Sequence, residues 1–119
     1  WRLYDSIWTE RYLDHPADNV EGYRASSPVT HAAGLADALL VVHGTADDNV
    51  HPQNTLVLAH SLIAAGRPFE QALYPRQMHG FRGLASRHVY QRMAEFFDRH
   101  LGGGEAAGGG AGNGSGKVP

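Results

Sequence analysis

The run Ala-Leu-Leu-Val-Val at residues 38–42 constrains the fold of this chain more than any other stretch, because it is apolar at every position. Such a run fits a strand that is buried on both faces, as in a parallel sheet. The polar loop 43–51 ends this strand. Pro52 suits the first position of a helix, where its missing N–H costs nothing, and apolar residues recur at helical spacing through 52–65. We expect Gly66 to close that helix as its C′ residue.

A second unit of the same kind follows. Residues 69–74 alternate in part and lie between two prolines, which predicts a strand. The loop 75–84 comes next, and a helix is expected from about Ser86 to Leu101. Strand, loop and helix in this repeated order indicate an α/β fold with a parallel sheet. Since two strands are few for such a sheet, we expect the chain to form the end of a larger domain.

The two flanks of these units differ in composition. Residues 1–12 carry large aromatic side chains with i,i+4 spacing, which predicts a helical turn or two. Residues 14–28 are rich in turn formers and are expected to be irregular, with at most a short helix. Residues 102–119 hold too little apolar mass to offset their ordering entropy. We therefore expect 1–101 to be the folded part and 102–119 to be a flexible, Gly-rich tail.

The charge and cysteine content exclude several classes of function. The net charge is −2, and no basic run stands out, so we expect neither a nucleic acid nor an anionic membrane as partner. The absence of cysteine excludes disulfides, thiolate metal sites and a cysteine nucleophile, although it leaves the compartment open. The longest apolar runs are far shorter than the roughly twenty residues of a membrane-spanning helix.

Two polar loops, each after a predicted strand, carry the main functional clue. Asp47 lies in the first loop and His79 in the second, 32 residues later. In open α/β sheets, ligands bind beyond the carboxyl ends of the strands, where both loops fall. A buried carboxylate that accepts a hydrogen bond from one imidazole nitrogen fixes the tautomer, so that the other nitrogen can take a proton from a nucleophile.

These features also have simpler interpretations. Asp-Asp-Asn after a strand is often only a cap for the next helix, and His-Gly is often only a turn. Of the eight histidines, His43 and His51 flank the first loop, but they lack the ligand spacing of zinc sites, so we expect no metal and no cofactor. An aromatic group near the N-terminus forms either a packed helix face or the wall of a pocket; its members are Trp1, Tyr4, Trp8 and Tyr12.

The motifs LVVHGTADDNVH at 40–51, YDSIWTERY at 4–12 and HG at 79–80 closely resemble the C-terminal end of the dipeptidyl peptidase IV family, serine peptidases of the prolyl oligopeptidase clan. The resemblance covers about residues 1–101. It implies an α/β-hydrolase fold, in which the catalytic residues follow the chain order Ser, Asp, His. It further implies cleavage of N-terminal dipeptides from peptides with Pro or Ala in second position.

The resemblance assigns roles to seven residues of this chain. Asp47 and His79 match the aspartate and histidine of the catalytic triad. Asn49 matches the asparagine that helps to hold the substrate's carbonyl and N-terminal side. The remaining matches are to walls of the pocket for the penultimate residue: Tyr4, Trp8, Val50 and Trp1.

The chain departs from the family pattern at several positions. Trp8 stands where better-known members have Tyr, Pro52 where an aromatic is common, and Gln77-Met78 where acidic residues are frequent, which puts the substrate preference in doubt. The Gly-x-Ser-x-Gly motif of the nucleophile is absent, and Ser115 does not fit it. We therefore expect the serine to precede residue 1 and the chain alone to be inactive.

Two rival hypotheses remain open. One is an oligopeptidase or acylaminoacyl peptidase of the same clan. The other is a non-catalytic module that forms a homodimer through the helix 86–101, with Phe96 and Phe97 as its candidate surface. In the dipeptidyl peptidase hypothesis the partners are a peptide substrate and the upstream part of the same protein, which supplies the serine.

Overall fold

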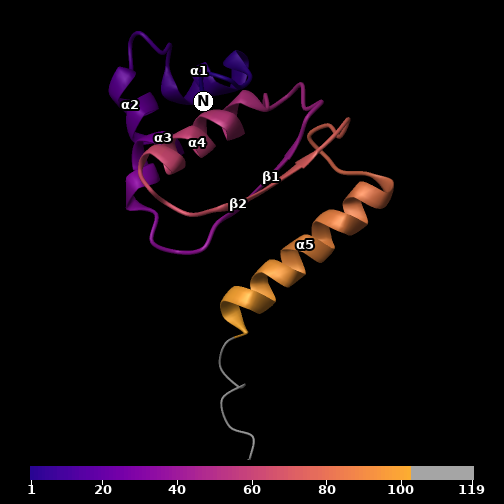
Figure 1. Cartoon of the computed structure of the whole chain (residues 1–119). Helices are drawn as coiled ribbons and strands as arrows, with labels where there is room; N and C mark the ends of the chain where they lie inside the picture. Colours follow the sequence, from indigo (N-terminus) through magenta and orange to yellow (C-terminus); the bar gives the residue numbers. More distant parts are fainter. Residues whose placement is uncertain (103–119) are drawn as a thin grey trace, which may run out of the picture.

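Two short parallel strands connected by a helix form the centre of the structure (Figure 1). The structure is a computed structural model in which residues 1–102 are described; the tail expected at 102–119 lies outside them except for Gly102. Figure 1 shows α4 on one side of the strands and α5 on the other, an α/β arrangement as predicted. The elements are α1 (Ser6–Leu13), α2 (Val20–Ala25), α3 (Pro28–His31), η1 (Ala32–Gly34), β1 (Leu40–Gly44), α4 (Gln53–Ala64), β2 (Glu70–Tyr74) and α5 (Gly83–Leu101).

The strand β1 begins two residues later than the apolar run suggested. Its partner β2 pairs with it from Leu40 opposite Glu70 to Gly44 opposite Tyr74, so the polar His43 belongs to the strand. The backbone pairing with β2, rather than the apolar pattern, sets these bounds. The expectation of burial on both faces is wrong for the described part of the chain: the first three residues of β1 are only half-buried, because within residues 1–102 the sheet has two strands.

The helix α4 ends as its sequence predicts. Gly66 has a φ of 65°, a conformation that costs glycine little. Its N–H donates to the carbonyl of Ile63, and the N–H of Arg67 donates to that of Leu62, at 3.0 and 2.9 Å. This pair of bonds is a Schellman motif. At the other end of α4, Pro52 occupies the N-cap rather than the first helical turn.

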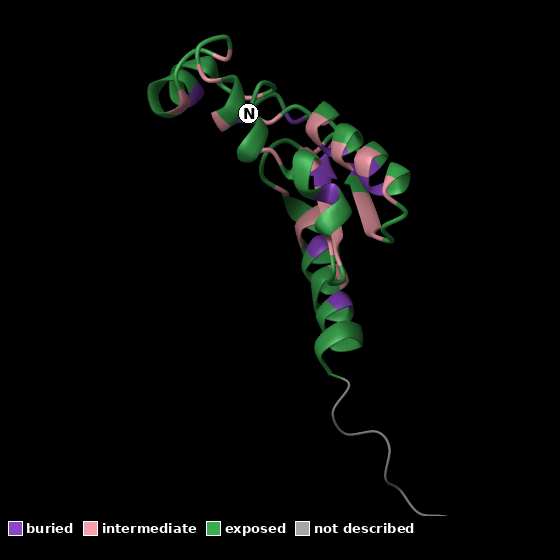
Figure 2. Cartoon of the chain, turned by 90° about the vertical axis from the view of Figure 1, so that its left-hand side faces the viewer, coloured by how far each residue is buried: buried purple, intermediate pink, exposed green. Residues whose placement is uncertain are grey.

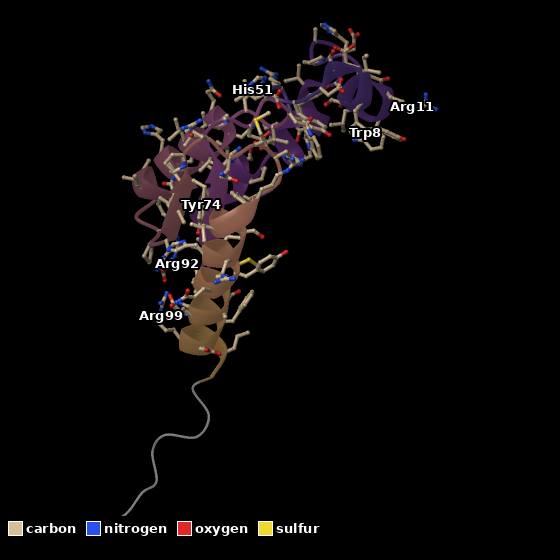
Figure 3. All side chains as sticks on the ribbon, turned by 90° about the vertical axis from the view of Figure 1, so that its right-hand side faces the viewer. Trp8, Arg11, His51, Tyr74, Arg92 and Arg99 are labelled. Carbon is tan, nitrogen blue, oxygen red and sulfur yellow. The ribbon has the colours of Figure 1, made fainter. Side chains whose placement is uncertain are left out.

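The helix α5 is held against β2 by polar as well as apolar contacts. The hydroxyl of Tyr74, a buried residue at the end of β2, lies 2.9 Å from Nδ1 of His88. Glu70, at the start of β2, pairs with Arg92 and Arg99, which lie along α5 in Figure 3. Phe96 is buried, whereas Phe97 is 49% exposed. The two phenylalanines therefore do not share one exposed surface.

The N-terminal segment packs beside the start of α4 (Figure 1). Asp5 caps α1 by accepting a hydrogen bond from the N–H of Ile7. The side-chain amide of Asn54, in α4, donates to the carbonyl of Leu3 at 3.1 Å, and so joins residues 51 positions apart. The short helix α2 agrees with the sequence expectation, but α3 and η1 were not predicted.

Most buried residues lie where the strands meet α4 and α5, and a few lie in the N-terminal helices and η1 (Figure 2). Within residues 1–102, no helix is long and apolar enough to cross a membrane. The buried apolar residues are Tyr23, Ala32, Ala59, Leu62, Tyr74, Val89 and Phe96. Four polar residues are also buried, and three of them belong to the site described next: Thr9, His43, Asp47 and Thr55.

Candidate active site

The loop after β1 wraps its backbone around the carboxylate of Asp47. Oδ1 accepts hydrogen bonds from the N–H groups of Asn49 and Val50, at 3.0 and 2.9 Å. The Asp47 N–H donates to the carbonyl of Gly44 at 3.2 Å, which closes a tight turn at the strand end. Only 5% of Asp47 is exposed. Oδ1 of this carboxylate is thus hydrogen bonded within the loop, and Oδ2 is available to accept a bond from another segment.

The partner of Oδ2 is His79, from the loop between β2 and α5. Its Nδ1 lies 3.0 Å from Oδ2 of Asp47. An ionised carboxylate can only accept, so Nδ1 carries the proton and donates it in this bond. The side chain of His79 is 60% exposed, and among residues 1–102 no group hydrogen bonds to its Nε2. In the neutral ring, Nε2 therefore has a free lone pair that faces no partner from this part of the chain.

Burial raises the pKa of Asp47. The hydrogen bonds from His79 and from the Val50 and Asn49 amides lower this pKa, and together they outweigh burial, so the pKa lies below its usual value. The carboxylate is therefore ionised at neutral pH. An ionised Asp47 fixes the tautomer of His79 and stabilises the imidazolium that would form if Nε2 took up a proton.

The two loops meet because their backbones are bonded to each other. The N–H of Thr45 donates to the Tyr74 carbonyl at 2.9 Å, and that of Ala46 donates to the Gln77 carbonyl at 3.0 Å. In return, the N–H of Arg76 donates to the Thr45 hydroxyl at 3.1 Å. These bonds continue the pairing of β1 with β2 beyond the strands and carry His79 to Asp47.

Gly44 makes this close approach possible. A Cβ at this position would collide with the carbonyl groups of Gln77 and Met78, and would lie only 2.5 Å from the Met78 oxygen. No side chain fits there without displacement of the loop that carries His79. The sequence alone did not indicate this role, because a glycine at a strand end has many interpretations until the neighbouring segment is known.

His43 is also part of the site, although the sequence raised it only as a metal ligand. It is buried beside Asp47, between the hydroxyl of Thr55 and the carbonyl of Val50. His51, by contrast, is exposed. Among residues 1–102, no three His, Asp or Glu side chains are grouped so that they could hold a metal ion. A polar residue in an otherwise apolar strand was the available signal for His43.

The structure places the other predicted site residues in two separate groups. Asn49, which is exposed, and Val50, which is half-buried, lie in the Asp47 loop. Trp1 and Trp8 line a cavity of about 360 Å³ in the N-terminal segment. Figure 3 shows Trp8 at the opposite end of the molecule from Arg99. Tyr4 lines a neighbouring cavity with Trp1.

His79 belongs to a different cavity from these aromatic residues. That cavity has a volume of about 460 Å³, and Asp48 and Met78 are among its lining residues. The structure therefore brings Asp47 and His79 together, but it does not bring the aromatic residues into the same cavity as His79. The N-terminal segment that carries the aromatic residues is bonded to α4 by the side chain of Asn54, which donates to the Leu3 carbonyl.

Comparisons with known proteins agree with the resemblance of the motifs. The family model described as the prolyl oligopeptidase family matches residues 1–104. Prolyl endopeptidase FAP of Homo sapiens is 39% identical over 99 residues, and dipeptidyl peptidase 4 of Sus scrofa is 40% identical over 100 residues. Each alignment covers 81% of this chain but 13% of the relative.

A solved structure is similar over a comparable share of the chain. The crystal structure of dipeptidyl peptidase 4 from Porphyromonas gingivalis matches with a TM-score of 0.82 and 42% sequence identity. The match covers 85% of this chain and 14% of that protein. The chain thus spans about an eighth of the length of the relatives it matches.

Proposed function

The chain belongs to the prolyl oligopeptidase family, a family of serine peptidases, and we propose that it carries the acid–base half of a peptidase active site. Asp47 orients His79 through the Nδ1–H bond. His79 takes the proton of a serine nucleophile on Nε2 and returns it to the leaving amine. The observation that carries the proposal is the 3.0 Å contact between Nδ1 of His79 and Oδ2 of the buried Asp47.

The serine in this proposal comes from outside the 119 residues. The chain has no Gly-x-Ser-x-Gly motif, and among residues 1–102 no serine hydroxyl hydrogen bonds to His79. A preceding segment of the same protein is the proposed source. The isolated chain then lacks both the nucleophile and the oxyanion donors, so we expect it to have no peptidase activity.

The proposed substrates are peptides from which an N-terminal dipeptide with Pro or Ala in second position is removed. Asn49 and Val50 are suited to substrate contact because they lie two and three residues after Asp47 in the same loop and hold its carboxylate through their N–H groups. The aromatic side chains of Trp1, Tyr4 and Trp8 supply flat apolar walls of the kind that bind a proline ring. In this proposal, the segment that supplies the serine also completes the pocket between the aromatic residues and His79.

An assay with two substrates tests this proposal against the endopeptidase alternative. The protein that includes the residues encoded before Trp1 is assayed on Gly-Pro-p-nitroanilide and on the same compound with a blocked N-terminus. We expect turnover of the free compound only, and none by the 119-residue chain. Turnover of the blocked compound at a similar rate would favour an oligopeptidase of the same family, and enzyme-like turnover by the 119-residue chain would contradict the need for an outside serine.

One observation favours a second candidate function, an association module. The outward face of α5 carries apolar side chains at helical spacing that are exposed in the described structure. Sedimentation of the 119-residue chain tests this function: a concentration-dependent dimer supports it, and a monomer at all concentrations contradicts it. The exposed residues of this face are Tyr90, Met93, Phe97 and Leu101.

A further inference from the structure

The buried imidazole of His43 lies beside the carboxylate of Asp47, with its Nε2 near the oxygen that also contacts His79. Its Nδ1 is 2.6 Å from the hydroxyl oxygen of Thr55 in the first turn of α4. Its Nε2 is 2.8 Å from the carbonyl oxygen of Val50 and 3.4 Å from Oδ2 of Asp47. The side chain of His43 is 9% exposed, so these contacts replace water almost completely. The mechanism proposed above does not use this residue.

The contacts define where the proton of His43 lies in the neutral ring. A backbone carbonyl can only accept, so the bond to Val50 requires a proton on Nε2. Nδ1 then carries a lone pair, which accepts from the Thr55 hydroxyl. In this tautomer each ring nitrogen has a partner of the right kind. The opposite tautomer would turn the lone pair of Nε2 toward two oxygens, the Val50 carbonyl and Asp47 Oδ2, and would leave both without a donor from this ring.

Val50 connects His43 to the catalytic pair through its two backbone polar groups. The N–H of Val50 donates to Oδ1 of Asp47, and the carbonyl of Val50 accepts from His43. His43 therefore holds Val50 in place, and Val50 in turn holds the carboxylate of Asp47. Its Nε2–H also lies near Oδ2 of Asp47, the oxygen that receives the proton of His79. Two imidazoles thus approach the same carboxylate oxygen, one buried and one exposed.

We propose that His43 is a positioning residue, which together with Thr55 holds the Asp47 carboxylate in the orientation that keeps the proton of His79 on Nδ1. This inference rests on the proposed function only for its effect on catalysis. Its structural part concerns the Asp47–His79 bond and holds whether or not the protein is a peptidase. His43 does not contact a substrate or a reacting atom in this account.

Three substitutions at position 43 distinguish the contributions of the two ring contacts, that of Nε2 with Val50 and that of Nδ1 with Thr55. His43→Gln places an amide N–H near the position of Nε2 and keeps a donor for Val50. His43→Asn places an acceptor near the position of Nδ1 and keeps the contact with Thr55. His43→Phe removes both contacts while keeping a ring of similar size. The matched control is His60→Gln, at an exposed position on α4.

The first readout is the tautomer of His79, measured by ¹⁵N NMR of ring-labelled 119-residue chain. We expect the Nδ1–H form to dominate in the original chain, in His43→Gln and in His60→Gln. In His43→Asn and His43→Phe the populations are expected to shift toward the Nε2–H form. An unchanged His79 tautomer in folded His43→Asn or His43→Phe would overturn the proposal.

Thr55 offers an independent test that leaves the buried ring in place, and it decides the matter if the position-43 variants do not fold. Thr55→Val removes the hydroxyl at nearly constant volume, whereas Thr55→Ser retains it. Without the Thr55 hydroxyl the His43 ring can take the opposite tautomer and lose its Nε2–H donor, which a Gln amide cannot do. We therefore expect Thr55→Val to shift the His79 tautomer and Thr55→Ser to keep the original populations. Equal His79 spectra in these two variants would contradict a role for the Thr55–His43 contact.

The catalytic consequence is measured in the protein that includes the serine-bearing segment. His43→Phe is expected to lower kcat by about a hundredfold or more with little change in KM, since general acid–base catalysis typically contributes factors of this size. His43→Gln should retain most of kcat. A tautomer shift of His79 without a loss of kcat would refute the catalytic part of the inference. If the original protein has no activity but the tautomer shift is observed, the proposed function fails and the structural role of His43 stands.

Discussion

Nδ1 of His79 lies 3.0 Å from Oδ2 of Asp47, although 32 residues separate the two in the chain. The contact depends on the parallel pairing of β1 with β2, which brings the carboxyl ends of both strands to one edge of the sheet. Backbone bonds from Thr45 and Ala46 to the opposite loop then set the distance between the two side chains. An exposed imidazole and a buried carboxylate are thereby held in the arrangement that acid–base catalysis requires.

We predict that Gly44→Ala weakens this arrangement and the fold together. The added Cβ would collide with the carbonyl groups of Gln77 and Met78, so the loop that carries His79 must move away from Asp47. Overpacking of this kind costs about 1–3 kcal/mol of unfolding free energy. Urea denaturation of the 119-residue chain measures the change, and NMR of His79 reports the loss of its bond to Asp47.

Gly34→Ala is the matched control for this prediction. A Cβ at Gly34 has no atom within 4 Å, and the residue has no positive φ. We expect its effect on the unfolding free energy to stay within about 0.5 kcal/mol, as for most surface substitutions. Equal effects of the two substitutions would show that the close approach at Gly44 does not constrain the loop.

The pH dependence of stability provides a second prediction. The folded-state pKa of Asp47 is lowered, and its unfolded value is about 3.9, so between these values the unfolded chain binds more protons. The stabilisation by Asp47 is therefore complete above about pH 4 and is lost as the pH falls through the folded-state pKa. The difference in unfolding free energy between the original chain and Asp47→Asn should shrink over this range.

Other carboxylates do not interfere with this comparison, because they are present in both proteins. Glu70, for example, has a pKa lowered first by its hydrogen bond from Arg99, and its contribution cancels in the difference. A difference that stays constant from pH 6 to pH 2 would mean that the carboxylate of Asp47 does not titrate as its surroundings predict.

A third prediction concerns the aromatic pocket wall. Trp8 is 52% exposed, and its ring lies 4.9 Å from that of Tyr12. If Trp8 contacts the substrate, Trp8→Ala should lower kcat/KM for Gly-Pro-p-nitroanilide by about tenfold or more, since burial of a large apolar side chain contributes roughly 1.5–3 kcal/mol. Steady-state kinetics of the protein that includes the serine-bearing segment measure this change.

Two further variants define the role of the ring. Trp8→Tyr keeps a flat wall and should cause a smaller loss than Trp8→Ala, with a change in preference between Pro and Ala substrates. Ile63→Ala removes an apolar side chain that is 69% exposed at the end of α4, and should leave kcat/KM unchanged. Similar kinetics for Trp8→Ala and Ile63→Ala would remove Trp8 from the pocket.

The sequence predicted best those elements whose signals are local. Gly66 marked the end of α4 because the left-handed conformation that closes a helix favours glycine. The small helices α3 and η1 were missed, since they have few residues and depend on distant partners, such as the hydrogen bond from Arg67 to the Ala33 carbonyl at 2.9 Å. The bounds of β1 were shifted because β2 sets them through backbone pairing.

In the candidate site too, residues with a local sequence signal could be predicted and residues that depend on distant partners could not. Asp47 and His79 could be selected because each follows a predicted strand, and parallel strands end at one edge of a sheet. The roles of Gly44 and Thr55 could not be predicted, because each depends on a residue elsewhere in the chain. Gly44 lies against the carbonyl groups of residues 77 and 78, and Thr55 contacts the ring of His43, 12 positions before it. Close backbone approach leaves no pattern in a single sequence.

The central claim is that His79 activates a serine supplied from outside these 119 residues, and labelling with a fluorophosphonate, which reacts with activated serines, tests it most directly. Four forms of the protein that includes the preceding residues are treated with the fluorophosphonate: the original sequence, Asp47→Asn, His79→Ala and a control. The control is Asp37→Asn, at an exposed position. We predict one labelled serine, located before Trp1 by mass spectrometry, with labelling lost in His79→Ala, strongly reduced in Asp47→Asn and unchanged in Asp37→Asn. Labelling that persists at the original rate in His79→Ala, or that falls on a serine within residues 1–119, would contradict the account.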